Sequence, residues 1–200
     1  MGYIDIMGQM VIPTQIPIAG DFHEGLAYVE AVGPYSSGGF INKKGEPAID
    51  PLPGRIPQLA QFSEGLTVIS KAVPWPRFAI FGQQREKVKS GYMNTGGKIV
   101  IRPQFDAARN FSEGLAEVGK NSARGEQQGQ EIVEMKWGYI DKTSKMVIPA
   151  QFKETKAFSE GLAAVTEDGQ KWGYIDRKGQ IAIPMQFESA KAFKGELANE

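Results

Sequence analysis

The sequence predicts an all-β protein made of tandem three-stranded antiparallel meanders in an elongated or superhelical array. Three observations predict this fold: one pattern recurs five times, its apolar runs have strand length, and turn residues separate the runs. Each copy begins with glycine, an aromatic residue, an aliphatic residue and Asp or Asn. A phenylalanine follows the glycine by twenty residues in four copies and by 23 in the second. The five glycines are Gly2, Gly39, Gly91, Gly138 and Gly173.

The first two strands of each copy form a predicted hairpin. The aromatic-aliphatic run and the Val/Ile run that follows are rich in strand formers and too short for stable helices. Between them lies Asp/Asn-x-x-Gly, with Ser replacing Gly once. In such a turn the Asp or Asn side chain bonds to the backbone two residues on, and Gly takes a left-handed conformation. In most copies the second run ends at proline, which lacks an N–H, so we expect the ladder to end there.

A second turn, Phe-Ser-Glu-Gly-Leu, leads into a third strand with the pattern Leu-Ala-x-Val. In the fourth copy this strand, Leu162 to Val165, is followed by an Asp-Gly pair, a strong hairpin signal, and by the next Gly-aromatic strand. That next strand is apolar on both faces, because Trp172 and Tyr174 alternate with Ile175. We therefore expect each small sheet to pack between two neighbours, since a single meander is only marginally stable.

The five copies span residues 1–30, 39–69, 91–118, 136–165 and 171–198, within one repeat domain covering residues 1–200. We expect the first copy to lack its Leu-Ala-x-Val strand, and the last copy stops just after Leu197-Ala198. We favour a chain that is part of a longer protein. The alternative is a small five-bladed propeller-like ring, in which Leu197-Ala198 pairs with residues 2–5. Three strands and 35 residues per copy weigh against the ring, because a propeller blade has four strands and roughly 40–45 residues.

The fourth copy carries, in order, Lys-Trp-Gly-Tyr-Ile-Asp, Ile-Pro-x-Gln-Phe and Phe-Ser-Glu-Gly-Leu-Ala, and the fifth carries the first two of these segments. This order closely resembles the WG β-repeat family, which is found mostly in bacterial proteins. In the first three copies the tryptophan is replaced by Met1, Gly38 and Ser90. The resemblance implies a β-repeat scaffold with no settled activity, and it brings no catalytic or binding residues. The predicted structural repeat positions are Trp137, Gly138, Tyr139, Trp172, Gly173 and Tyr174.

Composition excludes several functional classes. Lys and Arg (23) balance Asp and Glu (23), so there is no bulk positive charge to attract nucleic acid. The absence of cysteine excludes disulfides, thiol chemistry and Cys-ligated zinc. No apolar run approaches the ~20 residues of a membrane span, and we expect no signal peptide, because Met1 is followed directly by the first predicted strand. The compartment stays unknown, since cytoplasm and bacterial envelope both fit, and we predict no cofactor and no metal.

The sequence predicts no catalytic residues. His23 is the single histidine, at a turn position where later copies have serine. Asp141 and Asp176 each precede a cation, which disfavours calcium binding. A glutamate recurs beside each turn glycine, where we expect it to cap or solvate the turn, and an acid–base pair is the less favoured alternative. These glutamates are Glu24, Glu64, Glu113 and Glu160.

The strongest binding candidates lie in the insertion between the second and third copies: Trp75, Arg77, Phe78 and Phe81. Trp, Arg and aromatic residues dominate binding hot spots, and the repeat core does not require them here. The alternative is that they pack the inserted hairpin against the array. We expect a non-catalytic scaffold that presents a repeated surface to a protein partner, and the alternative is glycan or cell-envelope recognition through exposed aromatics. Buried Trp137 and Trp172 would favour the scaffold.

Overall fold

The structure is a computed structural model that describes residues 2–12, 18–30, 39–49, 52–57, 60–73, 87–127 and 130–194. These residues form strands and turns without a helix, in small antiparallel sheets that do not close into a barrel. The predicted all-β fold of tandem meanders is confirmed. None of the described segments is a helix of the length and hydropathy needed to span a bilayer. The chain divides into two compact units, Met1–Gln104 and Phe105–Glu200.

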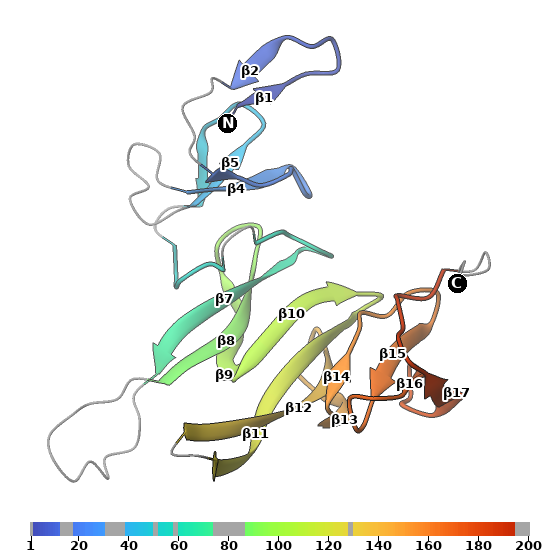
Figure 1. Ribbon diagram of the computed structural model, residues 1–200. Helices are drawn as coiled ribbons and strands as arrows, with labels where there is room; N and C mark the ends of the chain where they lie inside the picture. Colours follow the sequence, from blue (N-terminus) through green and yellow to red (C-terminus); the bar gives the residue numbers. More distant parts are fainter. Residues whose placement is uncertain are drawn as a thin grey trace, which may run out of the picture. The chain divides into compact units, whose positions relative to one another are not determined.

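Unit 1 contains three sheets, each following the order of the chain (Figure 1). The first is a two-stranded hairpin of β1 (Tyr3–Ile4) and β2 (Met10–Ile12). The second has four strands: β3 (Ile18–Ala19), β4 (Leu26–Glu30), β5 (Gly39–Asn42) and β6 (Pro47–Ile49). The third has three: β7 (Leu66–Val73), β8 (Lys87–Asn94) and β9 (Ile99–Phe105).

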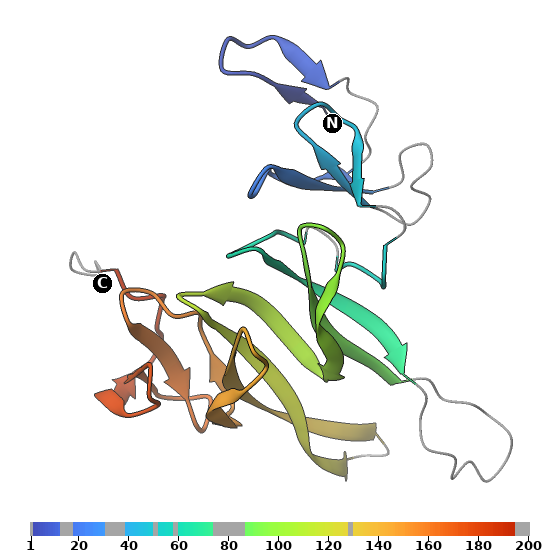
Figure 2. The same cartoon turned by 180° about the vertical axis from the view of Figure 1, so that it is seen from behind.

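Unit 2 contains two four-stranded sheets, which Figures 1 and 2 show from opposite sides. The first consists of β10 (Ala107–Ser112), β11 (Leu115–Gln127), β12 (Gln130–Asp141) and β13 (Met146–Phe152). The second consists of β14 (Glu154–Thr155), β15 (Leu162–Thr166), β16 (Trp172–Asp176) and β17 (Ile181–Phe187). The β11–β12 hairpin has the longest strands and contains the insertion between the third and fourth copies.

Each sheet after the first combines the end of one sequence copy with the start of the next. In the last sheet, β14 and β15 belong to the fourth copy, and β16 and β17 to the fifth. Three sheets carry an edge strand that the sequence analysis missed: β3, β10 and β14. Because propeller blades also have four strands, the number of strands in a sheet no longer distinguishes an open array from a propeller-like ring. The open array stays a prediction. The expectation that the first copy lacks its Leu-Ala-x-Val strand is wrong, since Leu26–Glu30 forms β4. The expectation that proline ends the second strand is also wrong, since β13 and β17 continue through Pro149 and Pro184 and pair again beyond them.

The Glu-Gly pairs occupy type I′ hairpin turns. In all four described pairs φ is positive at both residues, 52° to 55° at the glutamate and 78° to 83° at the glycine. The flanking residues exchange two backbone hydrogen bonds, as His23 and Leu26 do at 2.9 and 3.0 Å. A type I′ turn needs left-handed backbone at both central positions and matches the twist of the strands, which explains why the second residue is glycine.

The Asp/Asn-x-x-Gly turns have the predicted side-chain bonds. Asp141 Oδ1 accepts hydrogen bonds from the backbone N–H groups of Thr143 at 2.8 Å and Lys145 at 3.0 Å. Ser144 takes the left-handed position of this turn with φ of 71°. The equivalent residues of the other copies are glycines with φ between 77° and 81° (Gly8, Gly45, Gly97 and Gly179). The sequence analysis therefore identified the strained position correctly.

The glycine of each WG motif permits a close approach of two backbones. A Cβ on Gly138 would lie 2.5 Å from the Ile148 carbonyl oxygen and 2.7 Å from Ala150 N. A Cβ on Gly173 would lie 2.6 to 2.9 Å from the equivalent backbone atoms of β17. At both places the register of the ladder shifts, as it does at a β-bulge. Backbone atoms cannot rotate away as a side chain can, so glycine is required here.

Apolar cores lie between consecutive sheets of the same unit, as the stacking hypothesis predicts. The first two sheets of unit 1 share a core of Ile12, Ala27, Val29 and Ile41. The second and third share a core of Tyr28, Phe40, Ile49, Phe62, Ile69 and Met93. The two sheets of unit 2 share a core of Leu115, Tyr139, Ile148, Phe152, Phe158, Ala163, Val165 and Ile175.

The turn glycine of one copy lies over the central isoleucine of the copy before it. A Cβ on Gly45 would lie 3.3 Å from Ile12, and a Cβ on Gly179 would lie 3.2 Å from Ile148. A Cβ on Gly8, in the first hairpin, would have nothing within 4 Å. The first hairpin therefore has the turn geometry of the other copies, but among the described residues nothing lies beneath its turn glycine.

Candidate functional site

The predicted binding cluster of Trp75, Arg77, Phe78 and Phe81 lies outside the described residues. Its role in binding stays a prediction. The same holds for the pairing of Leu197-Ala198 with the first strand, because residues 195–200 also lie outside the described residues.

The two WG tryptophans that the structure describes are each covered by a cation. Trp172 is buried, and Lys156 Nζ lies 5.4 Å from its ring centroid. Trp137 is half-buried, and the Arg109 guanidinium carbon lies 4.2 Å from its ring centroid. Both cations stand two residues before the Phe of a Phe-Ser-Glu-Gly-Leu turn. A cation placed over an indole stabilises the fold and covers one face of the ring.

Arg109 also forms an ion pair with a buried carboxylate. Arg109 Nη1 lies 2.7 Å from Glu117 Oε1, and the Thr155 hydroxyl donates to the same oxygen at 2.9 Å. The same Arg109 nitrogen donates to the Thr155 carbonyl oxygen at 2.8 Å. Among the described residues Glu117 is the buried residue that carries a charge. The network satisfies this carboxylate and ties β10 and β11 to β14, which is a structural role.

The Glu117 position shows how one copy departs from the pattern. It is the variable residue of Leu-Ala-x-Val, and the other described copies place Tyr28, Val68 and Ala164 there, all buried. Burial, and secondarily the charge of Glu117, raises the pKa of the neighbouring Tyr139 phenol. That phenol donates to the Lys156 carbonyl oxygen at 2.8 Å, so it is held as a neutral donor rather than poised for acid–base chemistry. A comparison of the variable residues could have identified this site from the sequence.

The recurring glutamates bind the turn of the next copy. Within unit 1, Gly65 N–H donates to both carboxylate oxygens of Glu24, at 3.1 and 2.9 Å. Within unit 2, Gly161 N–H donates to Glu113 Oε2 at 2.9 Å. The sequence analysis expected each glutamate to cap or solvate its own turn, and it missed this bond between copies. Across the described part of the chain, no three His, Asp or Glu side chains gather closely enough to hold a metal ion.

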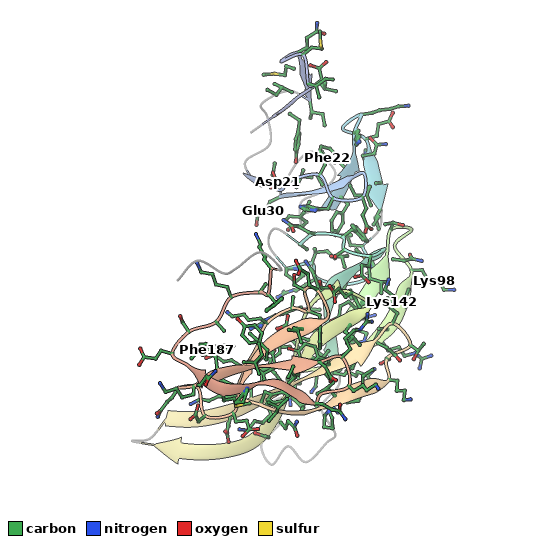
Figure 3. All side chains as sticks on the ribbon, turned by 90° about the vertical axis from the view of Figure 1, so that its right-hand side faces the viewer. Asp21, Phe22, Glu30, Lys98, Lys142 and Phe187 are labelled. Carbon is green, nitrogen blue, oxygen red and sulfur yellow. The ribbon has the colours of Figure 1, made fainter. Side chains whose placement is uncertain are left out.

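The first hairpin exposes an apolar turn tip, which the other described copies lack. Ile6 and Met7 form the tip of its turn and are 101% and 78% exposed. Ile4, Met10 and Val11 on the two strands are exposed as well. Figure 3 shows the first hairpin, with its side chains as sticks, beyond the labelled Phe22. The Phe22 ring packs against Tyr3 with centroids 4.7 Å apart. We define Ile4, Ile6, Met7, Met10 and Val11 as the first-hairpin surface.

The tip residues differ in chemistry from their equivalents. The same two turn positions hold cations or small polar residues in the other copies: Lys43-Lys44, Thr95-Gly96, Lys142-Thr143 and Arg177-Lys178. A solvent-exposed tip needs no apolar residue for folding, so stacking does not explain Ile6 and Met7. The sequence analysis treated these two positions as variable, and an alignment of the five turns would have identified them.

Short antiparallel sheets, Gly-aromatic strands and Glu-Gly turns in a fixed order define a tandem β-repeat protein. The sequence pattern of the WG-containing repeat family matches residues 1–31, 91–122, 137–170 and 172–199, and the chain belongs to this family. The second copy falls outside the matched ranges but forms the corresponding strands β5, β6 and β7. No curated protein and no solved structure matches the chain significantly.

Proposed function

We propose that this chain is a non-catalytic scaffold that binds another protein through the first-hairpin surface. The exposed tip of Ile6 and Met7 carries the proposal. Contiguous apolar surface of this kind is typical of interaction sites, and methionine adapts readily to the shape of a partner. Covering one such side chain contributes about 1.5–3 kcal/mol, so the two together contribute about 3–6 kcal/mol towards the binding free energy.

The local geometry supports a preformed binding surface. Asp5 Oδ1 accepts hydrogen bonds from Met7 N–H at 2.8 Å and Gln9 N–H at 2.9 Å, which fixes the turn that presents the tip. The Tyr3 hydroxyl donates to the Gly20 carbonyl oxygen at 2.8 Å and anchors the hairpin to the second sheet. A preorganised hairpin loses little conformational entropy on binding.

The proposal includes no catalytic role. The titratable groups that recur in the sequence hold the fold together, as Glu24 and Glu113 do by binding amides of the next turn. The glycan alternative depends on Trp75, which lies outside the described residues, because Trp172 is buried and Trp137 lies beneath Arg109.

The test replaces the tip with the turn of the second copy. The double variant Ile6→Lys, Met7→Lys keeps Asp5 and Gly8, so the turn should fold as it does at Lys43-Lys44. The matched control is Lys43→Gln, Lys44→Gln in the second turn. Chemical crosslinking and quantitative mass spectrometry in the source cells should show at least a tenfold loss of crosslinked partner for the tip variant and none for the control. Equal recovery with both variants would contradict the proposal.

A further inference from the structure

Four Gly-aromatic strands of this chain share one kind of neighbour. β5, β8, β12 and β16 each pair antiparallel with a strand of the pattern Leu-(Ala/Thr)-x-(Val/Ile). The register is the same every time. Leu pairs with Asp or Asn, Ala or Thr with the aliphatic residue, x with the aromatic residue, and Val or Ile with the glycine. In four places, therefore, the same strand pattern pairs in the same register with the same edge of a Gly-aromatic strand.

β1 is the fifth such strand, and no described residue pairs with its other edge. Its sheet has two strands, and among the described residues β2 is the one strand that pairs with it. Ile4 is 66% exposed, whereas the equivalent residues Ile41, Met93, Ile140 and Ile175 are all buried. An unpaired edge presents backbone N–H and C=O groups as a template for another strand.

The direction of the free backbone groups follows from bonds seen in the structure. Asp5 N–H donates to the Gln9 carbonyl oxygen, across the β1–β2 turn, at 2.9 Å. Successive N–H groups of a strand point to opposite edges, so Ile4 N–H and C=O point to the open edge. On the incoming strand the alanine faces β1 and the x residue faces away. The last sheet shows this directly, because the Ala164 carbonyl oxygen accepts from Lys156 N–H on the opposite edge, at 2.9 Å.

We propose that β1 binds an extended Leu-Ala-x-Val-type strand of another protein by strand addition. The incoming strand runs antiparallel, with its alanine opposite Ile4 and its valine opposite Gly2. This inference deepens the proposed function and rests on it, because it assigns a strand chemistry to the partner at the same hairpin. Backbone hydrogen bonds supply much of the affinity in this mode of recognition, and alternate side chains supply specificity.

The test uses a labelled peptide with the sequence of residues 159–166, Ser-Glu-Gly-Leu-Ala-Ala-Val-Thr, titrated with the full 200-residue chain and followed by fluorescence anisotropy. Saturable binding is expected. N-methylation of the alanine equivalent to Ala163 should weaken binding at least tenfold, because that amide faces Ile4. N-methylation of the alanine equivalent to Ala164 should change affinity less than about threefold, because that amide faces away.

The matched variants of the protein are Ile4→Pro and Ile4→Ala. Proline removes the N–H that points to the open edge, where the β1–β2 ladder does not use it, and edge strands tolerate proline at such positions. Ile4→Pro should weaken peptide binding at least tenfold, and Ile4→Ala less than about threefold. Circular dichroism should show the same fold for both variants.

Several results would overturn the inference. These are no binding, equal binding of the two methylated peptides, or binding that survives Ile4→Pro. Binding seen only after deletion of residues 195–200 would assign the edge to the chain's own end. Sedimentation that shows a dimer dissociated by Ile4→Pro would assign it to a second copy. If the peptide fails while crosslinking to a partner still depends on Ile6 and Met7, the strand inference is wrong and the proposed scaffold stands.

Discussion

The close approach of two backbones at the repeat glycine Gly91 predicts how much its substitution lowers the free energy of unfolding. A Cβ on Gly91 would collide with the Ile101 carbonyl oxygen, lie 2.6 Å from Pro103 N and lie 2.8 Å from the Arg102 carbonyl carbon. All three atoms belong to the backbone of β9, so the two strands must separate. Gly96 lies in the turn of the same hairpin, and a Cβ there would meet the Asn94 side-chain oxygen at 3.5 Å, an ordinary contact. Gly91→Ala and Gly96→Ala are therefore a matched pair.

The expected difference follows from two opposing effects. Overpacking typically costs 1–3 kcal/mol, and three backbone collisions place Gly91→Ala near ~3 kcal/mol. Both substitutions gain about 0.4–1 kcal/mol, because alanine restricts the unfolded chain more than glycine does. Gly91→Ala should thus lower the free energy of unfolding by about 2 kcal/mol, and Gly96→Ala should leave it unchanged or raise it slightly.

Urea denaturation followed by far-UV circular dichroism measures both variants. With a slope of about 1–3 kcal/mol per M urea, the midpoint of Gly91→Ala should fall by roughly 1 M relative to Gly96→Ala. Midpoints that coincide within about 0.2 M would refute the claim that close backbone approach explains this glycine.

Three further predictions concern unit 2. Ser144→Gly should raise the free energy of unfolding by about 0.5–1 kcal/mol in urea, because glycine adopts the φ of 71° without strain; a loss of stability would contradict this. A hydrogen bond from the Thr143 hydroxyl, and secondarily bonds from backbone amides, hold the pKa of Asp141 below its ordinary value. The stability that the ionised Asp141 contributes is therefore complete above about pH 4 and is lost as the pH falls through the folded pKa. Asp141→Asn should reduce the fall in the free energy of unfolding between pH 4 and 2, and an unchanged pH profile would contradict this. Arg109→Met should lower the free energy of unfolding by about 2 kcal/mol, which is less than for a fully buried ion pair because Arg109 is partly exposed. Adding Glu117→Val should restore most of the lost stability in thermal melts. A double variant no more stable than Arg109→Met would contradict this.

Local chemistry explains why much of the fold could be predicted from the sequence. The Asp-x-x-Gly and Glu-Gly turns depend on a few adjacent residues, and the structure gives Ser144 and Glu160 the positive φ that these turns need. The fixed period then implies that one solution recurs along the chain. The close approach at Gly138 depends on the opposite strand, yet recurrence alone identified the residue as structural.

The rest depends on contacts between copies, which the repeat pattern does not encode. The carboxylate of Glu24 bonds to an amide 41 residues away, and Glu117 is neutralised by Arg109 from the adjacent strand. The edge strand β14 has two residues, too few to give an alternating pattern. The candidate binding surface at Ile6 and Met7 is a departure from the repeat, so it becomes visible only when copies are compared position by position.

Hydrogen exchange of individual backbone amides tests the central claim most directly, namely that no described residue pairs with the edge of β1 at which the other four Gly-aromatic strands are paired. The account predicts that the Ile4 amide exchanges at nearly the rate of an unprotected peptide, while the amides of Ile41, Met93, Ile140 and Ile175 are protected at least a hundredfold. Protection of Ile4 equal to that of the other four, in the isolated chain, would show that its edge is already covered and would contradict the account.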